Sequence, residues 1–429
     1  MISASATAVF RRKVDRWVRE AVTNRVGSFD ELVGLLPGVY PTVVAESLAR
    51  LIASGSIESS DHRSASQRAT VKYRVAVDPA LALLPPPHPL DFDWRYAPEA
   101  IECLLSRILD LTQPGDTVVM LGTPSLYLAA SHRDLDRRFV LIDSSPPILE
   151  RLESVGSPGT LHQLDLFVDP LPAFEAAVVV ADPPWYGEYI EAFLWGASMC
   201  AGPSAHVLVS LPAVGTRPGC QRERSEFREV AGTQGLQTIA TFSGVLPYLS
   251  PPFEVNALSA AGWGSLPPDW RRGDLVTLAA RGKPNIRPTP PTPGPRWEER
   301  SFGWMRIRVR MSDATSVDPT LQQLVNGAVL SDVSRRHPLR DRATVWTSGN
   351  RIYGCAAPQV LVVILDAMVA RTDASTRVAA HLRSTLSRAE RQHVADTVSK
   401  ICRIAEVEAR ELDLSGWPRR LDLADQSAM

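Results

Sequence analysis

The sequence predicts a mixed α/β protein built on a mainly parallel sheet, with a small helical unit before the sheet and a mainly helical extension after it. Continuous apolar runs alternate with helical stretches in the middle of the chain, which is typical of parallel strands covered on both faces. Proline-rich stretches at residues 84–89 and 284–295 indicate connectors, because proline removes backbone donors and favours extended chain. We therefore expect three units, at about residues 1–80, 95–282 and 296–429.

The composition excludes several classes of protein. The 429 residues include 46 Lys+Arg and 47 Asp+Glu, and 45% are hydrophobic, so the chain is neither disordered nor a highly charged tail. The five cysteines lack C-x-x-C spacing and the eight histidines lack H-x-x-x-H spacing, which predicts free thiols and no metal site. No apolar run is long enough to cross a bilayer and no charged signal-peptide start is present, so we expect a cytoplasmic protein without membrane contact.

The first unit has the element order helix, helix, helix, hairpin. Apolar spacing and capping residues predict three helices and two short strands, over residues 12–24, 28–36, 42–54, 57–58 and 72–75. This order resembles a winged-helix domain in pattern only. Residues 1–75 carry 11 Lys+Arg against 7 Asp+Glu, which suits DNA or RNA, although the third helix contributes only Arg50. Binding of a nucleic acid and docking to another protein are equal alternatives for this unit.

Four apolar runs form the predicted sheet, namely Thr117–Leu121, Phe139–Asp143, Ala177–Ala181 and His206–Ser210. Ligands of such sheets bind beyond the carboxyl ends of the strands. Asp182-Pro183-Pro184-Trp185 directly follows the third run. Asp182 and the carbonyl of Pro183 can accept hydrogen bonds from an amine, the prolines stiffen the loop, and Trp185 offers a flat face for stacking. The tetrapeptide is therefore either a catalytic loop for transfer to an amine or a rigid turn.

Asp182 to Trp185 resembles the D/N-P-P-aromatic motif of class I S-adenosylmethionine-dependent amino-methyltransferases. Leu121 to Tyr127 (LGTPSLY) looks like the P-S-x-Y loop of the N6-adenine-methyltransferase-like family, and Phe253 to Asn256 (FEVN) is similar to that family's late N-E-F-type segment. The resemblance implies a Rossmann-like class I methyltransferase sheet over about residues 100–265, with S-adenosylmethionine as the cofactor.

The resemblance also implies roles for individual residues. The first loop would line the methionine and ribose end of the cofactor, with Gly122, Thr123, Pro124, Ser125 and Tyr127. Asp143 would accept hydrogen bonds from the ribose hydroxyls, and Asp165 would approach the adenine amino group. The acceptor amine would be held by the catalytic residues Asp182, Pro183, Pro184 and Trp185.

The acceptor and the transferred group remain open. The similar enzymes include methyltransferases of nucleic-acid adenine and of protein lysine, so we expect methyl transfer to one of these acceptors. Branched-chain polyamine synthases are similar too, with a winged helix, a comparable sheet and an Asp-Pro-Pro loop. They transfer aminopropyl groups and have an acidic first loop, whereas Gly122 to Ser125 contains no acid. Because this loop is also not glycine-rich, a scaffold without catalysis is a third alternative.

The last unit begins with an alternation of basic and apolar residues at positions 306–310. It predicts a half-exposed strand whose arginine face is either solvated or phosphate-binding. Residues 358–371 and 387–414 have helical patterns, the second starting with the capping pair Ser387 and Glu390. We expect an accessory unit that packs on the sheet or on a second copy of the chain in a homodimer.

Overall fold

The computed structural model divides into two compact units, which we describe separately. The first comprises residues 1–85, 94–250 and 264–291, and the second residues 86–93, 251–263 and 292–429. The N-terminal helices thus belong to the same unit as the large sheet. The structure describes residues 4–24, 26, 28–57, 79–263, 266–267, 269–284, 286–292, 294–313, 316–334 and 337–415.

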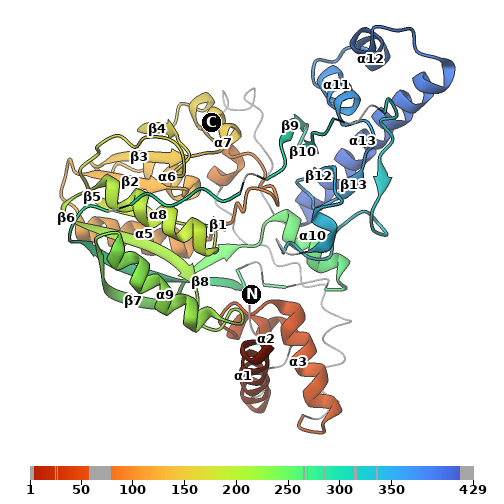
Figure 1. The fold of residues 1–429 in the computed structure, drawn as a ribbon. Coiled ribbons are helices and arrows are strands. Elements are labelled where there is room, and N and C mark those ends of the chain that lie inside the picture. Colours follow the sequence, from red (N-terminus) through yellow and green to blue (C-terminus); the bar gives the residue numbers. More distant parts are fainter. Residues whose placement is uncertain are drawn as a thin grey trace. The chain divides into compact units, whose positions relative to one another are not determined.

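The first unit is built on an eight-stranded sheet in the order β1-β7-β8-β6-β5-β2-β3-β4 (Figure 1). Its strands are β1 (Arg95–Tyr96), β2 (Thr117–Leu121), β3 (Arg138–Asp143), β4 (Thr160–Gln163), β5 (Ala176–Ala181), β6 (Ala201–Pro212), β7 (Leu236–Leu249) and β8 (Arg271–Ala280). The strands from β6 to β4 in this order run parallel, whereas β8 is antiparallel to both β6 and β7. The prediction of a mainly parallel α/β sheet is confirmed, and each of the four apolar runs forms a strand.

Helices connect the strands of this sheet. They are α5 (Pro98–Leu111), α6 (Pro124–Ser131), α7 (Pro146–Ser154), α8 (Gly187–Cys200) and α9 (Cys220–Thr233), of which α6, α7 and α8 make the crossovers between parallel strands. A proline starts α5, α6 and α7, where its missing N–H breaks no helical hydrogen bond. The chain leaves β2 toward β3 on one side and leaves β5 toward β6 on the other. The order of strands therefore reverses between β2 and β5, and their carboxyl ends form the crevice in which such sheets bind ligands.

Three helices precede the sheet, α1 (Ala4–Thr23), α2 (Phe29–Leu35) and α3 (Pro41–Ala53), and a short 3₁₀ turn η1 (Pro79–Leu83) follows them. The first helix begins earlier than its sequence pattern predicts. Ser28 caps α2 as expected, since its hydroxyl accepts the Glu31 N–H at 3.2 Å. Of the expected hairpin, Ile57 lies in a bend, and the remaining residues fall outside the described part of the chain.

The second unit combines a five-stranded sheet with helices. Its elements are α10 (Pro252–Ala260), β9 (Trp297–Phe302), β10 (Met305–Arg310), β11 (Gln322–Gln323), η2 (Pro338–Arg340), β12 (Val345–Thr347), β13 (Ile352–Gly354), α11 (Pro358–Val369), α12 (Ala374–Leu382) and α13 (Arg388–Ser415). The expected basic face of residues 306–310 is largely internal, because Arg306 is only 1% exposed and binds Asp91 and Glu299. Neither reading of that face, solvated or phosphate-binding, fits this arginine. Within the described ranges, no helix is long and apolar enough to cross a membrane.

Candidate active site

The loops after β2 and β5 meet at the switch point of the sheet. The Asp182 amide donates to the Leu121 carbonyl at 3.2 Å, and the Gly122 amide donates to the Ile142 carbonyl at 3.0 Å. Gly122 has φ +61°, and a Cβ there would lie 3.0 Å from the ring of Phe193 on α8. Glycine is therefore required at this position for both conformation and space. The predicted first loop and the Asp-Pro-Pro-Trp loop are brought together.

The Asp182 carboxylate is held by hydroxyl groups from neighbouring strands. Its Oδ1 accepts hydrogen bonds from Ser210 Oγ on β6 at 2.5 Å and from the Tyr248 hydroxyl on β7 at 2.7 Å. The two hydroxyl oxygens lie 2.5 Å apart, and the Tyr96 hydroxyl on β1 donates to Ser210 at 3.2 Å. Hydroxyl groups from three strands that are far apart in the sequence thus hold one carboxylate in place. Hydrogen bonds to a charged acceptor are strong and directional.

Burial controls the protonation of these phenols. Desolvation, together with the negative charge of Asp182, raises the pKa of Tyr248 and of Tyr96 well above the ordinary value. Both side chains therefore stay protonated at neutral pH. They act as donors toward the carboxylate and the serine, not as bases.

Trp185 is fixed at the end of the same loop. The Pro184 carbonyl accepts the Tyr186 N–H at 2.6 Å, which closes a tight turn. The Trp185 ring packs edge-on against Tyr248, with centroids 5.6 Å apart and planes at 88°. Arg217 Nη2 donates to the Trp185 carbonyl at 2.7 Å. Trp185 is half-buried.

A positively charged side chain lies among three tryptophans next to this loop. The Arg271 guanidinium carbon is 3.9 Å from the centre of the Trp94 ring, 4.8 Å from that of Trp270 and 5.9 Å from that of Trp185. These are distances of cation–π contact. Arg271 therefore brings positive charge close to the Trp185 ring.

The residues expected at the cofactor fall into two groups. Thr123, Pro124 and Ser125 are buried at the start of α6, and Thr123 Oγ1 has no hydrogen-bond partner within the described ranges. Asp143 ends the adjacent strand β3, where one carboxylate oxygen accepts the Ser145 N–H at 2.8 Å. An unsatisfied buried hydroxyl costs free energy unless a partner is supplied, so this loop and Asp143 fit a bound polar group.

Two other expected residues have side chains near opposite ends of β4, and of the two only Asp165 lies at the carboxyl end, beside the end of β3. The Tyr127 hydroxyl donates to the Pro158 carbonyl at 2.9 Å, near the amino end of β4. Asp165 is exposed in the turn after β4, where its Oδ1 accepts the Phe167 N–H at 2.9 Å. The Phe253–Asn256 segment lies in α10 of the second unit, where Asn256 donates to Glu411 at 2.9 Å. The Tyr127 amide donates to the Thr123 carbonyl at 3.0 Å within α6, but its hydroxyl binds at Pro158 and not at the loop around Gly122.

Sequence reasoning missed four residues of the site: Tyr96, Ser210, Tyr248 and Arg271. Ser210 ends one of the predicted strands, so its position at the carboxyl edge could have identified it. The two tyrosines and the arginine come from strands that pair antiparallel or were not predicted. No local pattern in the sequence places them beside Asp182.

The comparisons with known proteins agree on the fold. The strand order and the antiparallel β8 define a Rossmann-like sheet of the class I methyltransferase type. Neither a family model nor a curated protein matches this sequence. Among solved structures, the chain is similar to a mutein of the branched-chain polyamine synthase from Thermus thermophilus in complex with N4-aminopropylspermidine and 5'-methylthioadenosine, at 18% identity and a TM-score of 0.50.

That match covers 66% of this chain and 94% of the synthase. The synthase without these substitutions matches at 19% identity and a TM-score of 0.49, over the same shares of the two chains. An S-adenosylmethionine-dependent methyltransferase from Aquifex aeolicus matches at 15% identity and a TM-score of 0.29, over 42% of this chain and 89% of that one. At such identities the likeness concerns the fold alone.

Proposed function

We propose that this protein is an S-adenosylmethionine-dependent N-methyltransferase that acts on the amino group of a nucleic-acid base. The observation that carries the proposal is the anchored carboxylate of Asp182 beside the indole of Trp185 at the switch point of the sheet. An amine acceptor needs an oriented hydrogen-bond acceptor, and a planar acceptor gains from a stacking surface.

The cofactor side of the crevice would hold S-adenosylmethionine through the first loop and the end of β3. Gly122 lets the loop pack against the Phe193 ring of α8, and the Thr123 hydroxyl is available for a hydrogen bond. Asp143 stands where an acid accepts hydrogen bonds from ribose hydroxyls in nucleotide-binding sheets. When bound, the cofactor supplies an electrophilic methyl group on a sulfonium, so the acceptor need only be a correctly aimed amine.

The acceptor side would orient that amine. A carboxylate has about four lone-pair positions, and Asp182 would accept a hydrogen of the amine in addition to those of the hydroxyl donors on Oδ1. The Pro183 carbonyl would accept the second hydrogen. With both hydrogens directed toward the loop, the nitrogen lone pair is turned toward the cofactor side, which is a positioning effect.

A nucleobase amine fits this arrangement better than a lysine. The exocyclic amine of adenine is neutral at pH 7, whereas a lysine has a pKa near 10.4 and must lose a proton before it can attack. Tyr248 and Tyr96, the phenols nearest to Asp182, stay protonated and cannot serve as that base. Trp185 adds a stacking surface suited to a planar base.

Aminopropyl transfer to a polyamine is the second candidate. It uses the same geometry, an amine attacking a carbon attached to a sulfonium, and the similar Thermus thermophilus protein is a polyamine synthase. Two features count against a polycationic acceptor here: the first loop contains no acid, and Arg271 lies beside Trp185, whereas the charge of Arg217 is paired with Glu223 at 2.9 Å.

Two measurements test the proposal. Calorimetry should detect S-adenosylmethionine binding to the full chain that is weakened by Asp143→Ala and unchanged by Asp134→Ala, an exposed acid beyond α6. Labelled methyl transfer should then reach DNA or RNA and be abolished by Asp182→Ala. If the chain does not bind S-adenosylmethionine, the proposed methyltransferase activity is excluded. If product forms only from decarboxylated cofactor and a polyamine, aminopropyl transfer is established instead.

A further inference from the structure

We infer that the exposed basic face of α1 binds the sugar–phosphate backbone of the nucleic acid that carries the acceptor base. This face consists of Arg12, Arg16 and Arg19, which follow one another at intervals of four and three residues and so lie on one side of the helix. All three are exposed. We call them the α1 arginine face; their assignment to a nucleic acid rests on the proposed function.

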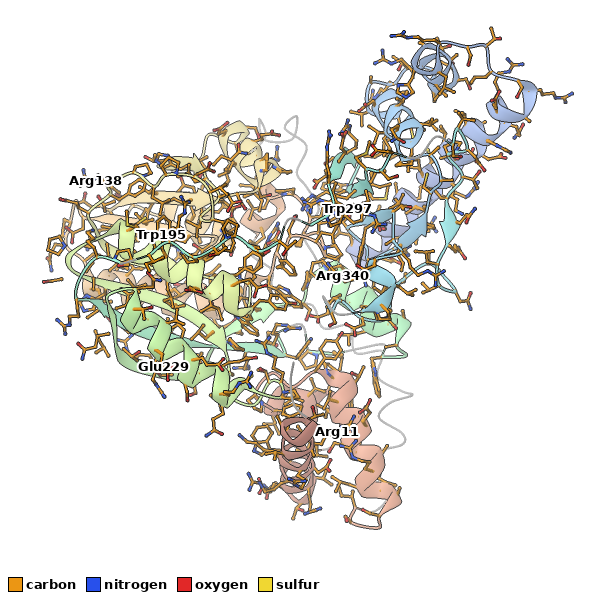
Figure 2. The ribbon with its side chains drawn as sticks, viewed as in Figure 1. Arg11, Arg138, Trp195, Glu229, Trp297 and Arg340 are labelled. Atoms are coloured by element: carbon orange, nitrogen blue, oxygen red, sulfur yellow. The ribbon has the colours of Figure 1, made fainter. Side chains whose placement is uncertain are left out.

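The packing of α1 fixes the direction of this face. Phe10, Val14 and Val18 are buried and form the opposite side of the helix, so the arginines must point outward. Arg11, labelled in Figure 2, and Lys13 flank the face, the ammonium of Lys13 lying 4.7 Å from the centre of the Trp17 ring.

The acids of α1 do not cancel this charge. The helix carries five basic and two acidic side chains. Asp15 binds Arg50 of α3 at 2.8 Å, and Glu20 lies 3.9 Å from Arg16, with both side chains 62% exposed. Such an exposed ion pair is weak and exchanges readily for a phosphate.

The third helix, α3, does not offer the same positive charge as α1. A winged-helix pattern predicts that α3 would contact nucleic acid, yet its single basic residue, Arg50, is engaged by Asp15 at 2.8 Å and lies 3.9 Å from Glu46. Ser47 also donates to Asp15 at 2.5 Å. These contacts join α3 to α1 and leave the positive charge on the outer side of α1.

The helix is attached to the acceptor loop within the same unit. A Cβ at Gly215, in the loop after β6, would clash with the indole of Trp17, so α1 packs directly against this backbone. Two residues further, Arg217 donates to the carbonyl of Trp185. At the N-cap of α3, the ring of Tyr40 packs edge-on against Trp270, with centroids 5.6 Å apart. Contacts therefore link α1 through one short loop to the proposed acceptor site.

The dimensions suit one strand of a nucleic acid. Arg12 and Arg19 are separated by about 10 Å along the helix axis at 1.5 Å per residue. The axial rise of DNA is about 3.4 Å per phosphate on each strand, so this span covers about three phosphates. Three contacts would contribute about 2.7 to the slope of log affinity against log salt concentration, at about 0.9 per phosphate.

The test uses the full chain and fluorescence anisotropy with labelled double-stranded DNA, single-stranded DNA and RNA of one sequence. The variant R12Q/R16Q/R19Q should bind at least one of them about 100-fold more weakly near 0.1 M salt, with a salt slope reduced by about 2.7 for the duplex or about 2.1 for a single strand. The matched control R377Q/R388Q/R403Q removes the same charge from exposed arginines of α12 and α13 and should change neither quantity. Unchanged thermal unfolding would show that both variants are folded.

Several results would overturn the inference. One is that the unmodified chain binds no nucleic acid at low salt. Another is that the two triple variants lose affinity equally. A third is that polyglutamate competes as effectively as nucleic acid, which would indicate an acidic protein as the partner. Methyl transfer to a short oligonucleotide that cannot reach α1 separates this inference from the proposed function. There R12Q/R16Q/R19Q should be as active as the unmodified chain, whereas on long acceptors its kcat/KM should fall. If no nucleic acid is methylated but nucleic-acid binding depends on the α1 arginine face, the proposed function is wrong and the inference about this face is supported.

Discussion

Replacing Tyr248 by phenylalanine tests whether the Asp182 carboxylate must be held in place for transfer. The substitution removes the hydroxyl that donates to Asp182 at 2.7 Å and keeps the ring that packs on Trp185 and, at 5.0 Å, on Tyr96. Ser210 remains as the second donor, so the carboxylate keeps one of its two hydroxyl contacts. The change therefore removes the contacts of this hydroxyl with Asp182 and with Ser210 and leaves the shape of the site intact.

The size of the effect follows from the charge of the acceptor. A hydrogen bond to an ionised group contributes about 1.5–3 kcal/mol. If that contribution is needed to orient the amine in the transition state, kcat should fall by about 10- to 150-fold. The affinity for S-adenosylmethionine should not change, because Tyr248 lies on the acceptor side.

Single-turnover methyl transfer together with calorimetry of cofactor binding measures both quantities. Tyr353→Phe in the second unit is a control for loss of a tyrosine hydroxyl. A cycle with Ser210→Ala should give a coupling energy of about 0.5–3 kcal/mol, because both hydroxyls act on the same oxygen. The raised pKa of Tyr248 also predicts no loss of activity from its ionisation between pH 7 and 9. A kcat for Tyr248→Phe within twofold of the unmodified chain would refute the positioning role.

Three further substitutions test other parts of the molecule. Gly122→Ala places a Cβ 3.0 Å from Phe193 at φ +61°, which costs about 1–2 kcal/mol of strain, and should weaken S-adenosylmethionine binding about tenfold by calorimetry. Trp185→Ala should raise KM for a nucleic-acid acceptor about 5- to 150-fold, as expected for one lost stacking contact of about 1–3 kcal/mol, whereas Trp185→Phe should retain most of the affinity. Burial would raise the pKa of Glu299, but hydrogen bonds and charge from Arg306 and Arg308 outweigh it and lower that pKa. Glu299→Gln should therefore destabilise the protein by about 2–4 kcal/mol at pH 7 and by less as the pH falls below about 4.5, measured by urea unfolding across pH.

The main architecture could be predicted from the sequence because parallel strands are buried on both faces. Their side chains are continuously apolar, so the runs from Thr117 to Leu121 and from Ala177 to Ala181 can be recognised as buried strands from the sequence. The tetrapeptide from Asp182 to Trp185 directly follows the second of these runs, and its place at the carboxyl edge followed from the strand alone.

The support of the site could not be predicted in the same way. Tyr96 and Tyr248 pair with each other across β1 and β7, and both reach Asp182 or Ser210 through non-local antiparallel pairing. Antiparallel register depends on contacts between distant segments, and neither tyrosine belongs to a recognisable motif. For Arg306 the sequence did contain a pattern, but the prediction drawn from it was wrong. Its alternating pattern predicted an exposed face, but Asp91 and Glu299 pair with it inside the second unit, and sequence periodicity carries no information about such ion pairs.

The charge beside Trp185 distinguishes the two transfer reactions that the loop could support. The Arg271 guanidinium lies 5.9 Å from the centre of the Trp185 ring, and Arg217 bonds to the backbone of the same residue. Two like charges about 6 Å apart near a protein surface repel by about 3 kcal/mol before screening by salt. A polyamine would bring several positive charges into this region, whereas a nucleic acid brings a neutral base and a negative backbone. Arg271→Gln should therefore raise KM for DNA or RNA and lower it for any polyamine that binds; a change in the opposite sense for both would mean that the site is built for a cation.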